Sequence, residues 1–255
     1  MCGVLAAIAL TPSAPVLVPE LAGAAAAEVA EFRAAALTAA AALPDRWVAI
    51  GVGAADVVIG PHTRGTFAGY GVDVAVALSA DAPGAVTALP LCALFARWLR
   101  GQANPSARVQ VRVYAADQGV DAALASGRAL RAEIDEADGP IGVLVVADGA
   151  NTLTPPAPGG YDPDAEMVQT ALDDALAAGD AAALTRLPNG IVGRVAYQVL
   201  AGLTEPKPRS ATELARGAPY GVGYFVGIWD PVGRSAATRE SDPVGRSAAT
   251  GESVE

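Results

Sequence analysis

The sequence predicts a three-layer α/β/α sandwich built on a mostly parallel or mixed central sheet. Short aliphatic runs alternate with alanine-rich helical stretches along most of the chain, which is typical of a sheet covered by helices on both faces. The chain is 52% apolar but only 5% aromatic, and this favours a Val/Ile/Leu sheet between alanine-rich helices. The segment PIGVLVVA (140–147) is apolar throughout. Such a run is typical of a strand buried on both faces, so we expect it at the centre of the sheet.

The individual elements follow from hydrophobic periodicity and from the turn residues between them. Strands are predicted at residues 4–10, 47–52, 57–60, 71–79, 108–114, 140–147 and 220–229. Helices are predicted at residues 19–43, 87–101, 119–137, 164–179, 180–187 and 191–203. The segments GVDVAVALS and RVQVRVY alternate valine with other residues, which indicates strands with two unlike faces. A polar, proline-rich loop at 148–164 follows the most apolar strand.

The chain divides into one α/β domain, residues 1–229, and a C-terminal tail, residues 230–255. The tail holds two twelve-residue copies, DPVGRSAATRES (230–241) and DPVGRSAATGES (242–253), which differ only at Arg239 and Gly251. Units with so few apolar residues cannot bury a core. Two copies are also fewer than the three that a repeat architecture needs. We therefore expect a disordered tail.

The composition excludes several classes of partner. The formal charge is −10 and no cluster of basic residues is present in the sequence, so neither nucleic acid nor an anionic membrane is an expected partner. No segment approaches the roughly 20 apolar residues of a membrane span, and the N-terminus lacks the positive region of a signal peptide. These features predict a cytoplasmic protein. Two cysteines, Cys2 and Cys92, make neither a disulfide framework nor a zinc site, and we expect Cys92 in the core.

Common catalytic and nucleotide-binding motifs are missing from the sequence. It contains neither a Gly-x-Ser-x-Gly elbow nor a Walker loop. The segment GVGAAD (51–56) begins like a dinucleotide-binding fingerprint, but Asp56 stands in place of the third glycine and a strand follows instead of a helix. We interpret it as a tight turn between strands.

The only histidine, His62, lies in VVIGPHTRG, directly after the predicted strand 57–60. Ligands of α/β proteins bind at strand ends, so His62 is a candidate metal ligand or base, the remnant of one, or a surface residue. Asp148 directly follows the predicted central strand, and it is either a site residue or the first residue of an Asx-turn. Glu20, Asp162, Asp164 and Glu166 are candidate ligands that also suit the first turn of a helix.

Five segments together resemble a known family. They are PSAPVLVPELAG (12–23), GTFAGYGVDV (65–74), the DG…APGGYDPDAE region (148–166), AYQVLAG (196–202) and APYGVGYFVGIW (218–229). In this order they resemble bacterial class III extradiol dioxygenase subunit-B-like (LigB-like) proteins, whose more distant superfamily includes Memo-like proteins. The resemblance spans about residues 4–229 and implies an α/β/α sandwich with a mixed sheet.

The resemblance also implies where a ring-cleaving site would lie. Active members hold Fe(II) with two histidines and a glutamate, and a further histidine acts as acid and base. Ser13 stands at the first ligand position, in Ser13-Ala14-Pro15, and His62 stands at the second. Thr152, preceded by Asn151 and eight residues before Gly160-Tyr161, stands at the acid/base position. The resemblance therefore implies the fold with only one of its three histidines, and the glutamate position stays unassigned.

Three hypotheses follow. The first is a LigB-like protein without Fe(II) ring cleavage that keeps a pocket for a small molecule or a partner, with Ser13, Asn151 and Asp162 lining it. The second is a metal-dependent dioxygenase or hydrolase with a rearranged site, in which His62, Asp148 and either Glu20 or Asp162 bind a divalent metal and His62, Asp148 and Thr152 act in catalysis. The third is a non-enzymatic interaction module that uses the acidic surface and the tail. The sequence indicates neither a definite cofactor nor an oligomeric state.

Overall fold

The computed structural model describes residues 4–80, 85–206, 208 and 210–231. Apart from Asp230 and Pro231, the predicted tail lies outside these residues. Within the described ranges, no helix is both long enough and apolar enough to cross a membrane.

A seven-stranded mixed sheet forms the middle layer, with the strand order β3-β6-β2-β7-β1-β9-β8. The strands are β1 (Val4–Thr11), β2 (Arg46–Gly53), β3 (Val57–Ile59), β6 (Arg108–Ala115), β7 (Pro140–Val146), β8 (Ser210–Gly217) and β9 (Tyr224–Asp230). Strands β6, β2, β7 and β1 pair in parallel, whereas β3, β9 and β8 pair antiparallel to their neighbours. The predicted fold class is confirmed, and the apolar segment 140–147 supplies the middle strand, β7.

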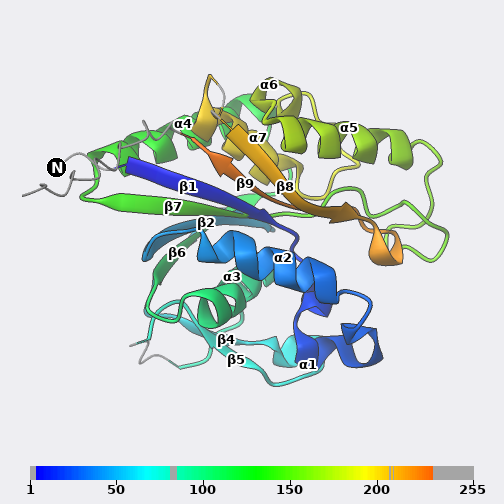
Figure 1. Ribbon diagram of the computed structural model, residues 1–255, viewed down its shortest axis with the longest axis horizontal. Helices are drawn as coiled ribbons and strands as arrows, with labels where there is room; N and C mark the ends of the chain where they lie inside the picture. Colours follow the sequence, from blue (N-terminus) through cyan, green and yellow to red (C-terminus); the bar gives the residue numbers. More distant parts are fainter. Residues whose placement is uncertain (1–3, 81–84, 207, 209, 232–255) are drawn as a thin grey trace, which may run out of the picture.

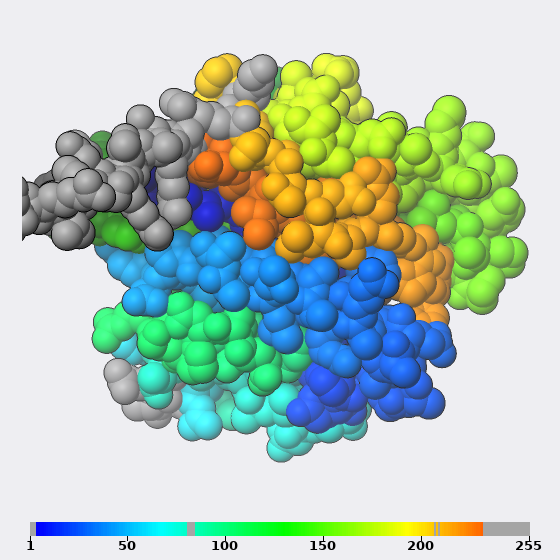
Figure 2. Space-filling model, viewed as in Figure 1, coloured from blue at the N-terminus to red at the C-terminus, as the bar shows by residue number. Residues whose placement is uncertain are grey.

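Helices cover both faces of this sheet (Figure 1). One face carries α4 (Val120–Glu136), α5 (Ala165–Ala178), α6 (Ala181–Leu184) and α7 (Arg194–Thr204), and the other carries α2 (Ala30–Ala41) and α3 (Leu91–Ala103). Strand β2 shows how the sheet separates two cores, because Val48 and Ile50 pack into the α4–α7 side while Trp47 and Ala49 pack into the α2–α3 side. Figure 2 shows the edge strand β8, in orange, between α2 in blue and α5 in yellow-green.

Two glycines bring α4 and α7 into close contact. A Cβ atom on Gly127 would lie 2.1 Å from the carbonyl oxygen of Val199, and one on Gly202 would lie 2.2 Å from that of Leu124. Any larger residue at these positions would therefore push the helices apart. These contacts set the short distance between α4 and α7.

Several boundaries differ from the sequence prediction. The predicted helix 19–43 is divided into α1 (Pro19–Ala22), a 3₁₀ turn and α2, because Gly23 adopts a φ of 53° at the end of α1, a conformation that favours glycine. Of the predicted strand 71–79, only β5 (Ala75–Ala77) forms, and it pairs with β4 (Arg64–Thr66) in a separate two-stranded sheet.

Strand β8 was not predicted at all. Its sequence, SATELARG, has no apolar run, and each of its residues is exposed or half-buried. It forms because β9 offers an unpaired edge, along which seven residue pairs form from Ser210↔Asp230 to Gly217↔Tyr224, with one register shift between Glu213 and Ala215. Cys92, by contrast, lies where the sequence placed it, in the core at 2% exposure.

Candidate functional site

The parallel strands β1, β2, β6 and β7 end at one edge of the sheet, and Asp148 lies there. It follows the end of β7 by two residues, and its Oδ1 accepts a 2.8 Å hydrogen bond from the backbone N–H of Ser13. The N–H of Ala147 donates to the carbonyl oxygen of Thr11 at 2.9 Å. The carboxyl ends of β1 and β7 are thus joined, at the edge where α/β proteins bind ligands.

The environment of Asp148 favours its protonated form. Burial raises the pKa of this carboxyl from 3.8 to about 6, although the Ser13 N–H partly offsets the increase. Asp148 is in no ion pair with the residues that the structure describes. Burial and then the charge of Asp148 raise the pKa of the Tyr197 and Tyr224 phenols. Asp148 can therefore take up or release a proton near neutral pH.

The loop after Asp148 brings three further predicted residues near one another. The N–H of Asp162 donates to the carbonyl oxygen of Thr152 at 3.0 Å, and the N–H of Gly159 donates to that of Asn151 at 2.9 Å. The carboxylate of Asp162 accepts from the N–H of Asp164, so it caps a turn before α5. Thr152 and Asn151 are half-buried, whereas Asp162 is exposed.

His62 does not lie at this edge, and the topology gives the reason. Strand β3 pairs antiparallel with β6, with Val57 opposite Val113 and Ile59 opposite Val111. The chain therefore leaves β3 toward the amino end of β6, the edge opposite to Asp148. His62 is exposed there. The hypothesis that His62 and Asp148 share a metal site is therefore not supported by this geometry.

Glu20 also lies apart from Asp148. It is an exposed residue in the first turn of α1, at a cavity of about 230 Å³ that β5 and α3 also line. None of the other predicted site residues lines this cavity. The structure thus separates Glu20, His62 and Asp148, which the rearranged metal site would have to bring together.

The residues present do not fit the Fe(II) site that the resemblance implies. Ser13 and Thr152 offer hydroxyl groups where that site needs imidazoles, and the one imidazole is at the opposite edge of the sheet. Among the residues that the structure describes, no three His, Cys, Asp or Glu side chains gather in a way that could hold a metal ion. The donor set of a ferrous facial site is therefore not assembled.

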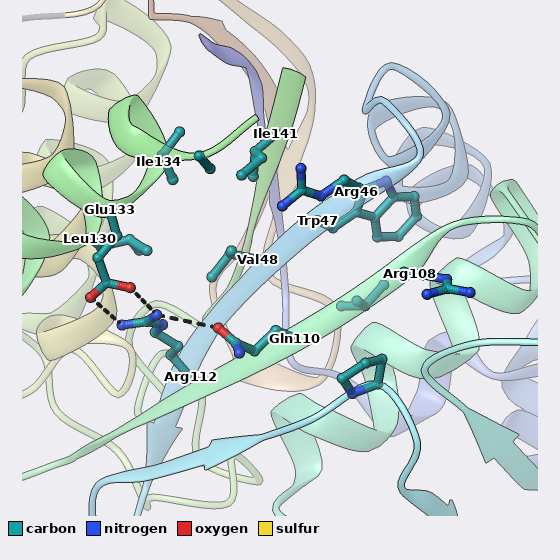
Figure 3. Close-up of a pocket in the computed structure, with 13 residues that line it drawn as sticks. Arg46, Trp47, Val48, Arg108, Gln110, Arg112, Leu130, Glu133, Ile134 and Ile141 are labelled. Carbon is teal, nitrogen blue, oxygen red and sulfur yellow. Dashed lines mark hydrogen bonds and ion pairs between the residues drawn. The ribbon is translucent and has the colours of Figure 1, made fainter. Parts of the chain in front are cut away.

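A groove that the sequence analysis did not predict lies between α4 and the amino-terminal halves of β2 and β6 (Figure 3). Its volume is about 430 Å³, which is within the range of small-molecule sites. We call it the arginine groove. It is lined by Arg46, Trp47, Val48, Pro61, Arg108, Val109, Gln110, Arg112, Leu130, Glu133, Ile134, Ala137 and Ile141.

The groove has an apolar side and a basic side. Val48, Ile141 and two residues of α4, Leu130 and Ile134, are core residues of the α4–α7 side of the sheet. The basic side consists of three arginines, Arg46, Arg108 and Arg112, against the single acid Glu133. In a chain with 27 acidic and 17 basic residues, this is a local excess of positive charge.

One arginine of the groove is neutralised within the protein. Arg112 donates to both carboxylate oxygens of Glu133, with its Nη1 3.0 Å from Oε1, and its Nη2 is 3.3 Å from Oε1 of Gln110. Figure 3 shows this cluster at the end of the groove away from Arg46 and Arg108. Arg46 donates to the carbonyl oxygen of Asp138. Neither Arg46 nor Arg108 forms an ion pair with a residue in the described part of the chain.

One sequence feature, the alternating pattern of β6, is typical of a strand that has such a groove on one face. In RVQVRVY the valines of β6 face the α2–α3 core, while Arg108, Gln110 and Arg112 occupy the alternate positions and face the groove. A strand with helices over its full length on both faces is apolar throughout, as β7 is. The polar alternation therefore indicated that one face of this strand is partly uncovered.

Comparisons with known proteins support the fold and leave the family open. No protein-family model matches this chain, and no curated protein sequence matches it. Among solved structures, the uncharacterized protein JW3007 from Escherichia coli K12 is similar at a TM-score of 0.55 and 11% sequence identity, over 88% of this chain and 99% of that one. At this identity the likeness concerns the fold alone.

Proposed function

We propose that this chain is a LigB-like protein that does not cleave aromatic rings through Fe(II) and that binds a small molecule in the arginine groove. The observation that carries the proposal is the groove itself, a concave site of about 430 Å³ with an apolar wall from α4 and polar groups from β2 and β6. The five family-like segments support the LigB-like assignment.

The side chains at the metal-ligand and acid/base positions do not suit ring cleavage. Ser13 has a hydroxyl at a metal-ligand position and Thr152 has one at the acid/base position, where the family has imidazoles, and β3 places His62 at the opposite edge of the sheet. A hydroxyl of ordinary pKa is neither a ligand equivalent to imidazole nor a base near neutral pH. Ser13, Thr152 and His62, placed as they are, do not support oxygen activation.

The first test addresses the chemistry. Purified protein is loaded with Fe(II) without oxygen and then offered protocatechuate and catechol while oxygen uptake is followed. We expect no uptake above that of free Fe(II). Turnover that disappears in His62→Ala would overturn the proposal.

The second test addresses the groove. The neutral fluorescent probe N-phenyl-1-naphthylamine is titrated into wild-type protein and into Ala137→Phe, which fills the groove from the end of α4. Ala132→Phe, on an exposed position of the same helix, is the matched control. We expect saturable binding that Ala137→Phe weakens at least tenfold and Ala132→Phe leaves unchanged. Equal binding in all three proteins would mean that the groove is not the site.

A further inference from the structure

We infer that the ligand of the arginine groove is an amphiphilic organic anion. Its carboxylate, sulfonate or phosphate group binds between Arg46 and Arg108, and its apolar part lies along the α4 wall. The inference rests on the proposed function, that the groove binds a small molecule, and it specifies the chemical class and the orientation of that molecule.

The two arginines without an ion-pair partner lie at adjacent positions of the sheet. Arg46 and Arg108 are register partners at the start of the parallel strands β2 and β6, and both side chains are exposed. Like charges at neighbouring positions of a sheet repel each other. Neither arginine forms an ion pair among the described residues, and Arg46 donates to a backbone carbonyl, that of Asp138, so no acidic side chain at ion-pair distance offsets this repulsion. An anion between them would remove it.

Arg112 differs from Arg46 and Arg108 in having an acidic partner. The carboxylate of Glu133 already takes both terminal nitrogens of Arg112, so that end of the groove is close to neutral. Arg46 and Arg108, which form no ion pair among the described residues, lie away from this cluster, as Figure 3 shows. Guanidinium groups bind oxyanions with paired hydrogen bonds. The charged group of a ligand is therefore fixed at one end of the groove.

Apolar side chains line the groove beside the arginines. Val48 and Ile141, which are 8% and 6% exposed, lie between the basic end and α4. Two residues of α4, Leu130 and Ile134, continue this surface. The apolar part of a ligand that contacts this wall would be removed from water, which favours binding. A purely inorganic anion would leave this wall unused, and so the ligand is organic.

The test uses two probes that differ in one group. 8-Anilino-1-naphthalenesulfonate has the same ring system as N-phenyl-1-naphthylamine, with an added sulfonate. Both are titrated by fluorescence into wild-type protein, Arg46→Gln/Arg108→Gln and the control Arg131→Gln, which alters an arginine of α4 that lies outside the groove. Because Arg46 and Arg108 are exposed, their substitution does not disturb a core.

We expect wild-type protein to bind the sulfonate at least tenfold more tightly than the neutral probe. The double variant should lose this difference, while its affinity for the neutral probe and the affinities of Arg131→Gln stay within twofold. Raising NaCl from 0.05 to 0.5 M should weaken the binding of the sulfonate probe and leave that of the neutral probe unchanged, since salt screens exposed charges.

Equal affinities for both probes in wild-type protein, with binding still lost in Ala137→Phe, would overturn the inference and leave the proposed function standing. A sulfonate preference that persists in the double variant would also overturn the inference. Binding of both probes that Ala137→Phe does not affect would overturn the proposed function, and the inference with it.

Discussion

The backbone N–H of Ser13 donates a 2.8 Å hydrogen bond to Oδ1 of Asp148, and this bond joins residues 135 positions apart in the sequence. It connects the loop after β1 to the loop after β7 at the carboxyl edge of the sheet. Both residues were candidate site residues from the sequence. The bond orients a carboxyl group whose pKa burial raises to about 6.

This raised pKa makes stability depend on pH. Because the folded protein binds the Asp148 proton more tightly than the unfolded chain, its contribution to stability is complete below about pH 4 and is lost as the pH rises through 6. Asp148→Asn keeps an acceptor for Ser13 and carries no charge. We expect the variant to equal wild type at pH 4 and to be more stable by up to about 3 kcal/mol at pH 7.5, since the pKa is raised from 3.8 to about 6. Urea unfolding at both pH values measures this, and an equal difference at the two pH values would contradict it.

His62 is expected to be a surface residue without a metal-binding role. It is exposed and lies at the sheet edge opposite Asp148. The free energy of unfolding of His62→Ala should match that of wild type within about 0.5 kcal/mol. Elemental analysis of protein purified without chelator should give the same metal content for wild type, His62→Ala and Asp148→Asn. A stoichiometric metal that both variants lose would show that the two residues share a site.

The contact between α4 and α7 should not tolerate a methyl group. Because a Cβ at Gly127 would lie 2.1 Å from the carbonyl oxygen of Val199, Gly127→Ala should destabilise the protein by about 1–3 kcal/mol and weaken binding in the groove that α4 lines. Gly101 in α3 has no atom within 4 Å of such a Cβ. Gly101→Ala is the control and should stabilise the protein by about 0.5–1 kcal/mol. Thermal unfolding of both variants separates steric from propensity effects.

Replacing two arginines of α3, Arg97 and Arg100, should change the free energy of unfolding in opposite directions. Arg97 is 1% exposed, its three guanidinium nitrogens have no hydrogen-bond partner among the described residues, and burial lowers its pKa to about 10. Arg97→Met should therefore raise the free energy of unfolding by about 1–3 kcal/mol.

Arg100, one turn further along α3, bonds to the carbonyl oxygens of Ala107 at 2.8 Å and Ala77 at 3.5 Å. Arg100→Met leaves these acceptors unpaired and should lower the free energy of unfolding by about 1–3 kcal/mol. Denaturant unfolding of the pair measures both effects. A loss of stability in Arg97→Met as large as that in Arg100→Met would contradict this prediction.

The repeat tail should be dispensable for folding. Residues 232–255 lie outside the described part of the chain, and their composition cannot build a core. Truncation after Asp230 should shift the melting temperature by no more than about two degrees and leave groove binding intact. Trypsin should cut first at Arg234, Arg239 and Arg246. Protection of these sites while sites within residues 1–229 are cut would place the domain boundary elsewhere.

The layers of the fold could be predicted from the order of apolar segments along the chain. The uniform apolar run of β7 indicated a strand covered on both faces, and the valine alternation of β6 indicated one face in the core. These predictions succeed because burial of a face is a local property with a fixed period along the chain. The candidate Asp148 followed from the same periodicity, since it lies just beyond the end of a buried strand, whereas Ser13 followed from the resemblance to the LigB-like family.

The choice of strand partners and their direction depends on contacts between distant segments and could not be predicted from the sequence. The three residues of β3 carry no signal for an antiparallel partner, yet that pairing places His62 at the edge opposite Asp148. Strand β8 exists only because β9 offers its edge. The arginine groove joins β2, β6 and α4, and the approach of α4 depends on glycine contacts with α7. Pairing and helix position depend on hydrogen bonds and packing between distant segments, which local periodicity does not encode.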